Sequence, residues 1–381
     1  MTGTRSGSTS TSSRSSKPSG RARTPVRAKK RFGQHFLSDI NILNRIVDAA
    51  EIAPDEIVLE VGPGLGALTA VLAERARRVV AVEVDRDLIA GLRARFADVP
   101  HVTIVEGDVL ECSPAELLGF TTEGTESTED LVGSSGDEFT TEAQRHRGLR
   151  EGERGGGGEG GELDIDEAPH PQPLSTPWRG GHDGSYVVVA NLPYNIAAPA
   201  LRRFLEGDVR PRRLVVMVQL EVAEAIVAKP GRMSLMSVAT QVYGDTQMVM
   251  KVAPGAFSPP PKVDSAVVRI DVMATPKVDV PIDAFFRIVR AGFGNPRKQL
   301  RNSLSFGLHV KQEIIDGVMV AAGVDATLRP QVLSLDDWAA ITRAWDGFTT
   351  EAQSHRGSVG GEEDVETSPR PSPPGGEGAR S

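Results

Sequence analysis

Cysteine is almost absent from this 381-residue chain, which contains only Cys112. A single cysteine cannot form a disulfide within the chain, and this fits a reducing compartment, so we expect a cytoplasmic protein. No motif that would activate a thiol surrounds Cys112, which predicts a packed structural cysteine. The chain also lacks any uninterrupted apolar run of roughly 18 residues, so we expect no membrane-spanning helix.

Acidic residues are missing from one segment and concentrated in another. Residues 1–31 hold nine Lys/Arg and no Asp/Glu, whereas residues 119–185 hold five Lys/Arg and fifteen Asp/Glu. The formal net charge of -8 therefore averages over opposite segments and says little about partners. Residues 1–28 also have almost nothing apolar to bury. They predict a disordered basic arm, which either lies near nucleic acid or has no role.

A glycine-rich turn between a strand and a helix is the clearest motif. The run I-V-L-E-V-G-P-G-L-G-A-L-T begins at Ile57, and its strand ends abruptly at Gly62, Gly64 and Gly66. Glycines permit positive φ and let a ligand lie against bare main chain, and the following helix offers its N-terminal N–H groups. The second strand delivers Glu83 about 20 residues later, where an acidic side chain reaches ribose hydroxyls. This stretch predicts a nucleotide-type cofactor site.

The glycine motif alone leaves the cofactor open, because its spacing also fits dinucleotide binding. Polar residues at the ends of other expected strands narrow the choice. Glu60 precedes the first glycine, Asp108 follows a third apolar run, and N-L-P-Y follows a fourth, beginning at Asn191. Acidic groups at successive strand ends suit a ligand with ribose, adenine and a cationic amino-acid part better than they suit a pyrophosphate.

Three further motifs lie outside this pattern. F-G-Q-H-F-L begins at Phe32, F-S-P-P-P-K-V-D-S begins at Phe257, and P-R-K-Q-L-R-N-S-L begins at Pro296. With E-x-G-x-G-x-G, E-V-D, G-D and N-L-P-Y, the chain resembles the class I methyltransferases that use S-adenosylmethionine. The first and last of the three motifs resemble those of the ribosomal RNA adenine dimethyltransferases, the KsgA/RsmA family. The resemblance covers essentially all of the foldable chain.

This resemblance implies an α/β, Rossmann-like class I S-adenosylmethionine-dependent methyltransferase fold with a small C-terminal all-helical domain. It also implies N6,N6-dimethylation of two adjacent adenosines in the 3'-terminal hairpin of small-subunit (16S) ribosomal RNA, as a step in small-subunit maturation. The implied cofactor is S-adenosyl-L-methionine, and the implied partner is the immature 30S subunit. We expect a monomer that uses no metal and no membrane.

The resemblance also assigns site residues. The cofactor-binding residues are expected to be Gln34, His35, Leu37, Glu60, Gly62, Gly64, Glu83, Asp108, Val109 and Asn191. At the target adenine, the side-chain oxygen of Asn191 and the backbone carbonyl of Leu192 would accept hydrogen bonds from the protons of the exocyclic amine. Tyr194 and Phe257 would stack on the two faces of the adenine base. Simple loop packing is the alternative for Phe257. No carboxylate is spaced to make His35 a general base, so we expect it to contact cofactor only.

Basic residues in the helical region are expected to bind RNA. Arg297, Lys298 and Arg301 interleave with amide side chains after G-F-G-N-P, which suits phosphate contact. The alternative is that these charged residues form a solvent-exposed helix face with no binding role.

Composition divides the chain into five parts. These are a disordered basic arm at 1–28, a methyltransferase domain at 29–275 that is interrupted by a disordered insertion at 120–184, a helical RNA-contacting domain at 276–347, and a disordered tail at 348–381. The ten residues Phe139–Gly148 recur as Phe348–Gly357 with one difference, Arg145 against Ser354. We interpret both copies as inserted repetitive sequence outside the fold; a docking motif used twice is the alternative. The expected strands are 57–61, 79–84, 102–105, 186–190, 214–218, 246–252 and 265–272.

Three other functions remain to be separated from this one. An oxidoreductase that binds NAD fits the glycines and Glu83 but leaves N-L-P-Y unexplained. A large-subunit ribosomal RNA adenine N6-methyltransferase of the antibiotic-resistance type shares most motifs, but the helix with P-R-K-Q-L-R-N-S-L argues against it. A non-catalytic assembly or transcription factor on the same fold is disfavoured by the intact Asn191 and Tyr194.

Overall fold

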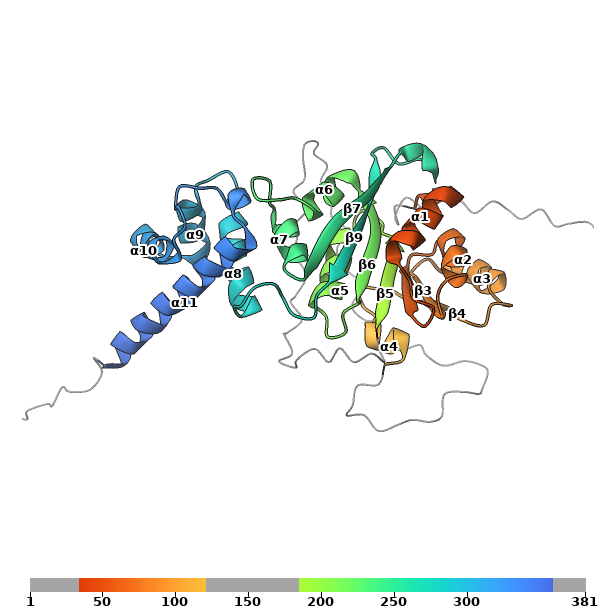
Figure 1. Ribbon diagram of the computed structural model, residues 1–381, viewed down its shortest axis with the longest axis horizontal. Coiled ribbons are helices and arrows are strands. Elements are labelled where there is room, and N and C mark those ends of the chain that lie inside the picture. Colours follow the sequence, from red (N-terminus) through yellow and green to blue (C-terminus); the bar gives the residue numbers. More distant parts are fainter. Residues whose placement is uncertain (1–33, 121–184, 359–381) are drawn as a thin grey trace, which may run out of the picture.

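The computed structural model describes residues 34–120 and 185–358. The expected N-terminal arm, residues 121–184 of the expected insertion and residues 359–381 lie outside these ranges. Figure 1 shows an α/β domain with a helical domain at one end. Within the described ranges, no helix combines the length and the apolar character needed to cross a membrane.

A seven-stranded sheet in the order β4-β3-β2-β5-β6-β9-β7 forms the centre of the first domain. Its strands are β2 (Ile57–Val61), β3 (Arg78–Glu83), β4 (Val102–Glu106), β5 (Tyr186–Asn191), β6 (Arg213–Gln219), β7 (Gly244–Val252) and β9 (Ser265–Val272). The strands β2 to β6 run parallel, and β9 is antiparallel to both of its neighbours. All seven expected strands are confirmed to within two residues. The order reverses between β2 and β5, and such a switch point opens a crevice at the carboxyl ends of the strands.

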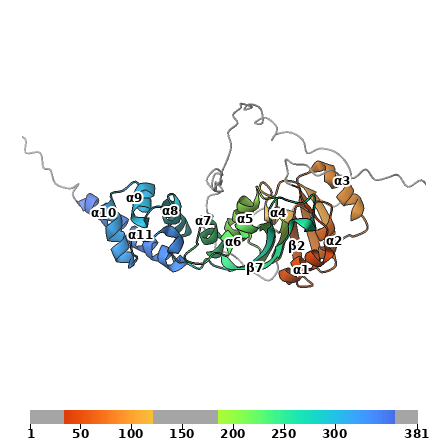
Figure 2. The ribbon, with the colours of Figure 1, turned by 90° about the horizontal axis from the view of Figure 1, so that it is seen from above.

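Both faces of the sheet are covered, as a parallel sheet requires. Along β5, Tyr186 and Val188 enter one apolar cluster with α5 (Ala197–Glu206), and Val187 enters another with α1 (Ile40–Ala50). Figure 2 shows α1 on one side of the sheet and α4 (Pro114–Leu118) with α5 on the other. The remaining helices of this domain are α2 (Ala67–Ala73), α3 (Arg86–Arg95), α6 (Leu220–Ile226) and α7 (Leu235–Gln241). The sheet therefore sits in a three-layer core with its strand ends free for a site.

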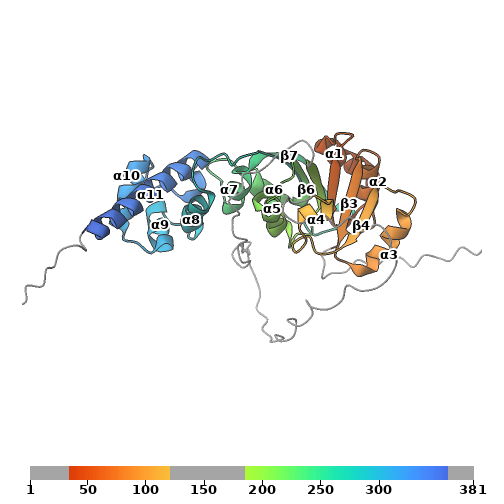
Figure 3. The same cartoon turned by 90° about the horizontal axis from the view of Figure 1, so that it is seen from below.

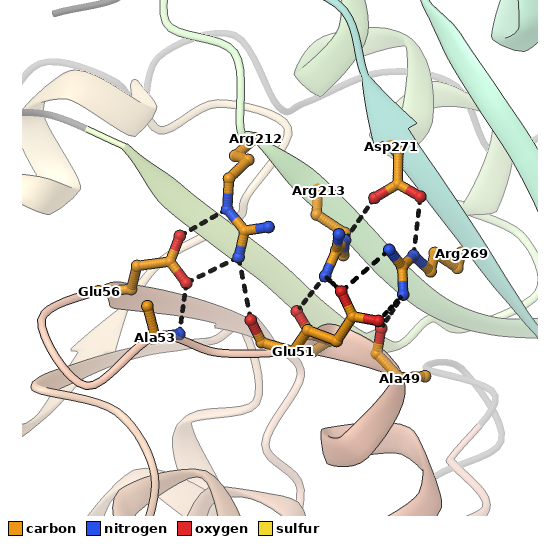
Figure 4. Close-up of polar contacts among 9 residues, drawn as sticks. Ala49, Glu51, Ala53, Glu56, Arg212, Arg213, Arg269 and Asp271 are labelled. Atoms are coloured by element: carbon orange, nitrogen blue, oxygen red, sulfur yellow. Dashed lines mark hydrogen bonds and ion pairs between the residues drawn. The ribbon is translucent and has the colours of Figure 1, made fainter. Parts of the chain in front are cut away.

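Three arginines hold the C-terminal end of α1 against the sheet (Figure 4). The last carbonyl oxygens of a helix lack intrahelical donors, and these are met by Arg269 on Ala49, Arg213 on Ala50 and Arg212 on Glu51, at 3.3, 2.9 and 3.2 Å. Carboxylates pair with the same guanidinium groups, namely those of Glu51, Glu56 and Asp271. The cluster therefore anchors α1, the helix that follows segment 34–39, to the sheet.

The helical domain consists of α8 (Ile282–Phe293), α9 (Leu300–Leu308), α10 (Gln312–Ala322) and α11 (Leu335–Ser358). Trp338 is fully buried, and its ring lies 2.4 Å from where a Cβ would stand on Gly292, so α8 and α11 approach closely only because that residue is glycine. Figure 3 shows this domain beyond α7, joined end to end with the first. At the joint, the Tyr243 and Phe286 rings stack at 6.3 Å.

Three expectations need correction. Helix α11 continues to Ser358, so ending the helical region at 347 was wrong, and the second copy of the repeat is helical rather than outside recognisable structure. The first copy lies outside the described residues. Phe120 belongs to the domain and not to the insertion, because its ring lies 6.2 Å from that of Tyr186.

Candidate functional site

A cavity of about 680 Å³ opens at the carboxyl ends of β2, β3, β4 and β5. This volume is typical of a small-molecule site. Every residue expected to bind cofactor or to act on the amine lines the cavity, that is Gln34, His35, Leu37, Glu60, Gly62, Gly64, Glu83, Asp108, Val109, Asn191, Leu192, Tyr194 and Phe257. Residues from several separate stretches of the chain are therefore brought together at the switch point of the sheet.

The glycine loop has the backbone that its sequence predicts. Gly62, Gly64 and Gly66 have φ values of 68°, 58° and 77°, a region that side chains with a Cβ rarely adopt. A Cβ added at Gly62 would lie 3.9 Å from the carbonyl oxygen of Asn191, and the main chain of Gly62 lines the cavity. The loop offers bare backbone to a ligand.

Glu83 fixes this loop from the neighbouring strand. Its Oε2 accepts from the backbone N–H of Gly64 at 3.1 Å, and its Oε1 accepts from that of Asp85 at 2.9 Å. Burial raises the pKa of the carboxyl, while both backbone donors favour its ionised form. Each carboxylate oxygen accepts more than one hydrogen bond, so ribose hydroxyls can still donate to Glu83.

Glu60 lies deeper, on β2, with 1% of its surface exposed. Its Oε2 has no hydrogen-bond partner among the described residues. Burial, with the charge of Glu83 adding to it, raises the pKa of Glu60 to about 8. An acidic oxygen without a partner at the wall of a cavity fits a cationic ligand group, which S-adenosylmethionine carries at its amino-acid end.

A short strand from the N-terminal motif closes the cavity. The strand β1 (Phe36–Leu37) pairs antiparallel with β8 (Phe257–Ser258), so that Leu37 lies opposite Phe257. Asn191 Nδ2 donates to the carbonyl oxygen of His35 at 3.2 Å. His35 Nδ1 donates in turn to the carbonyl oxygen of Pro259 at 2.8 Å. The F-G-Q-H-F-L motif is thereby bound both to the end of β5, through Asn191, and to the loop after β8, through Pro259.

The same segment reaches the glycine loop. Gln34 Nε2 donates to Asp85 Oδ2 at 2.8 Å, and the Phe36 ring lies 3.1 Å from where a Cβ would stand on Gly64. Phe36 also packs into the apolar cluster of α3 around Leu92. The motif therefore covers the loop as well as the cavity.

The residues expected to contact the target adenine begin at the end of β5. Asn191 is the last residue of that strand, and Leu192 is held by its N–H, which donates to the carbonyl oxygen of Met217 at 3.1 Å. The Tyr194 hydroxyl hydrogen-bonds to Ser265 Oγ at 3.0 Å, and its ring stacks on His35 at 6.0 Å. These contacts hold the N-L-P-Y turn rigidly at the mouth of the cavity.

Phe257 lines the cavity but is only 6% exposed. It belongs to the apolar cluster that contains Leu37 and Leu43. The structure therefore shows Phe257 packed beside the cavity, and its stacking on a base stays a prediction.

Asp108 follows the carboxyl end of β4. Its Oδ1 accepts from the backbone N–H of Leu110 at 2.9 Å, which orients the carboxylate beside Gly107. Cys112 Sγ lies 2.8 Å from where a Cβ would stand on Gly107. Burial and the charge of Asp108 raise the pKa of the thiol, which disfavours the nucleophilic thiolate. The cysteine is packed, as expected.

Sequence reasoning missed several supporting residues. Arg95 lines the cavity and donates from Nη1 to the carbonyl oxygen of Leu65 at 2.5 Å, which secures the glycine loop from α3. Ser265 anchors Tyr194, and Asp85 anchors Gln34. Asp85 and Ser265 lie inside the E-V-D and F-S-P-P-P-K-V-D-S motifs and Arg95 lies in none, but the contact that each residue makes forms only in the folded chain.

The three cations expected to bind RNA lie in the helical domain. Arg297 and Lys298 are exposed just before α9, and neither has an ion pair among the described residues. Arg301 pairs with Asp316 at 3.0 Å. The first N–H groups of α9 already donate to the carbonyl oxygens of Leu328 and Ala326, so a phosphate there would be bound by side chains rather than by the helix end.

Comparison with known proteins identifies relatives over most of the chain. The sequence model of the family described as "Ribosomal RNA adenine dimethylase" matches residues 26–340. "Ribosomal RNA small subunit methyltransferase A" of Dehalococcoides mccartyi (strain CBDB1) is 35% identical over 323 residues, which cover 84% of this chain and 90% of the relative. The protein of the same name from Geobacter metallireducens is 36% identical over 323 residues, covering 84% of this chain and 96% of the relative.

Two solved structures share the fold. The 23S rRNA methyltransferase ErmE is 23% identical with a TM-score of 0.54, over 82% of this chain and 99% of that one. A dimethyladenosine transferase from Plasmodium falciparum is 20% identical with a TM-score of 0.56, over 82% of this chain and 98% of that one. At these identities the likeness shows the Rossmann-like methyltransferase fold alone.

Proposed function

The chain belongs to the ribosomal RNA adenine dimethylase family, and on that premise we propose that it dimethylates N6 of two adjacent adenosines in the 3'-terminal hairpin of small-subunit ribosomal RNA. It is an S-adenosylmethionine-dependent ribosomal RNA adenine dimethyltransferase. The observation that carries the finer proposal is the shared cavity, in which the glycine loop, two buried carboxylates and the N-L-P-Y turn face one another. An NAD-dependent oxidoreductase would leave that turn and the β1–β8 pair without a use.

S-adenosylmethionine supplies an electrophilic methyl group when bound, and the chain's own residues orient it. We propose that Glu83 accepts from the ribose hydroxyls, that Asp108 accepts from the adenine amine with its Oδ2, and that Glu60 faces the cationic amino-acid end. Gln34, His35 and Leu37 would cover that end. Gly62, Gly64 and Val109 would present backbone and apolar surface to the rest of the cofactor.

The acceptor amine is a poor nucleophile because its lone pair is delocalised into the adenine ring. Asn191 Oδ1 and the Leu192 carbonyl oxygen would accept hydrogen bonds from its two N–H groups, hold the nitrogen tetrahedral and direct the lone pair at the methyl group. Asn191 Nδ2 is engaged with His35, which leaves Oδ1 as the acceptor of that amide. Orientation of this kind can contribute about 7 to 11 kcal/mol, so no strong base is required.

Tyr194 and Phe257 would hold the extruded base between them. Aromatic stacking of a base contributes on the order of 1 to 3 kcal/mol per contact, and extrusion is the general route to a base inside a duplex. Tyr194 is prepared for this because Ser265 fixes its hydroxyl. Phe257 would contribute while also packing against Leu37.

The RNA would be held by both parts of the chain. We propose that the domain at 29–275 carries the chemistry, that the helical domain of α8 to α11 contacts RNA, and that Arg297, Lys298 and Arg301 bind phosphates. The substrate would be the immature 30S subunit, met in the cytoplasm by a monomer.

Transfer of labelled methyl groups to undermethylated small subunits tests this function. We expect N6,N6-dimethyladenosine at two adjacent positions in the 3'-terminal hairpin, identified by nucleoside analysis and primer extension. Intact small subunits, already methylated, serve as the control. Label that enters only large-subunit RNA would instead assign the antibiotic-resistance type of methylation.

A further inference from the structure

The carboxyl of Glu60 is buried at the wall of the cavity, and its Oε2 atom accepts no hydrogen bond from the part of the chain that the structure describes. The side chain is 1% exposed, lines the cavity, and has no hydrogen-bond partner at Oε2 among the described residues. Leaving an ionised carboxylate in such a place costs several kcal/mol, and a group so placed takes up a proton instead. The geometry therefore favours a neutral acid while the cavity holds no cation.

Among the described residues that line the cavity, Arg95 carries the one permanent positive charge, and it does not lower the pKa of Glu60. Its neighbours across the ladder, Ala81 of β3 and Val189 of β5, are apolar. The titratable groups that line the cavity are Glu83 from β3, Asp108 after β4, His35 beside β1, Tyr194 after β5 and Arg95 from α3. Arg95 is engaged by the Leu65 carbonyl oxygen, and its side chain is exposed. The nearest charge that acts on Glu60 is the negative one of Glu83.

The two buried carboxyls differ in what they accept. Both oxygens of Glu83 accept backbone N–H groups, from Gly64 and Asp85, and such donors stabilise the ionised form. Glu60 has no donor at Oε2, and only Thr69 of α2 opposes the rise of its pKa, which burial takes to about 8. Of the pair, Glu60 is therefore the group that carries a proton near neutral pH.

We propose that Glu60 is protonated in the cofactor-free protein and releases its proton to solvent when the cationic amino-acid end of S-adenosylmethionine enters the cavity. The inference rests on the proposed function, because a cationic ligand group beside the carboxyl is what favours its ionised form. The step balances: the O–H bond of Glu60 breaks, buffer takes the proton, and the carboxylate faces the ligand's cation. Cofactor binding then depends on pH through this one side chain, and affinity rises as pH rises toward 8.

Titration calorimetry in two buffers of different ionisation enthalpy measures the proton directly. At pH 7 the full-length protein should release roughly 0.9 proton per cofactor, as linkage predicts for a group whose pKa falls from about 8 on binding. Glu60→Gln keeps the shape of the neutral acid and should lose this release. Comparison of the two proteins cancels any proton that the cofactor itself exchanges. Glu106→Gln replaces an exposed carboxylate on β4 that pairs with Arg86 of α3, and this variant should release as the wild type does.

Infrared difference spectroscopy gives a second readout that does not depend on the variant's binding. The wild type should lose the band of a protonated carboxyl when cofactor is added, and an unchanged band overturns the inference. Release that persists in Glu60→Gln but disappears in Glu83→Gln would place the proton on the other carboxyl and also overturn it. Wild type that binds cofactor without release refutes the inference and leaves the proposed function standing. Wild type that binds no cofactor refutes the proposed function itself.

Discussion

Asn191 and His35 are 156 residues apart in the chain, yet the side-chain amide of the first donates to the backbone carbonyl of the second at 3.2 Å. The residue proposed to polarise the amine is thus oriented by the segment proposed to cover the cofactor. The hydrogen bond that orients the Asn191 side chain is therefore also one of the contacts that close the cavity.

Asn191→Ala should reduce turnover far more than it reduces cofactor or RNA affinity. Its hydrogen bond to the amine is made mainly as the nitrogen becomes tetrahedral, so removing it acts on kcat. Single-turnover methyl transfer with separate binding measurements would resolve the two effects. Asn195→Ala, an exposed neighbour in the same turn, is the matched control. Equal losses in kcat and in affinity would assign Asn191 to binding rather than to chemistry.

Gly64→Ala should weaken cofactor binding without unfolding the domain. A Cβ at φ 58° costs about 1 to 2 kcal/mol, and it would lie 3.1 Å from the Phe36 ring that covers the loop. Gly91→Ala is the control, because Gly91 lies within α3 with nothing within 4 Å of the added carbon. The control should stabilise the protein by about 1 kcal/mol at unchanged cofactor affinity. Calorimetry and thermal melting report the two quantities, and equal cofactor affinities in the two variants would contradict the prediction.

Replacing Arg297 or Lys298 by Ala should lower the salt dependence of RNA binding. Each phosphate that the protein no longer neutralises reduces the slope of log affinity against log salt by about 0.7 to 0.9. Both side chains are exposed, so their removal should leave cofactor affinity and melting temperature unchanged. Arg75→Ala is the control, since Arg75 follows the end of α2 that points away from the cavity. If the salt dependence of RNA binding is the same in both variants as in the wild type, Arg297 and Lys298 are solvated surface residues that do not bind phosphate.

Stability should fall in acid partly through Glu51. Hydrogen bonds from Arg269 and then Arg213 lower the pKa of this carboxyl from 4.5 to about 2. A depressed folded-state pKa contributes stability that is present above the unfolded value of 4.5 and is lost as pH falls toward 2. Denaturant unfolding of Glu51→Gln should therefore show a shallower loss between pH 4.5 and 2 than the wild type. Parallel curves for the two proteins would mean that the ion pairs at the end of α1 do not persist in solution.

Replacing residues 121–184 by a short Gly/Ser bridge should preserve the fold and methyl transfer. The residues on either side meet in space, because the rings of Phe120 and Tyr186 lie 6.2 Å apart. A few residues can therefore span the gap, and long surface insertions cost little loop entropy in any case. Melting temperature and labelled methyl transfer, each compared with the full chain, check the outcome. A lower melting temperature or a loss of methyl transfer in the deletion variant would mean that residues 121–184 are needed for stability or for activity.

The sequence was informative wherever function depends on local residue type and spacing. The glycines at Gly62 and Gly64 need positive φ, and Glu83 ends a strand of β-branched residues, so local pattern is enough to place all three. Their assembly in one cavity followed from the parallel order of strands alone.

Other parts depended on contacts between distant segments and left no local pattern. The two-residue strands β1 and β8 are too short for a period, and pairing Phe36 with Ser258 requires the closed domain. The capping of α1 by Arg212, Arg213 and Arg269 likewise appears only when β6 and β9 stand side by side. The extension of α11 through a repeated sequence was not predicted, because a repeat with the composition of a linker can still continue a helix that precedes it.

The pairing of Leu37 with Phe257 also sets an order on biosynthesis. A growing chain on the ribosome presents its first motif some 220 residues before the partner strand leaves the exit tunnel. Until then the early segment can contact Asp85, the glycine loop and Asn191, but it cannot form the β1–β8 pair, so the cover of the cavity stays incomplete. Nascent chains arrested before Phe257 should therefore bind cofactor more weakly than the full-length chain.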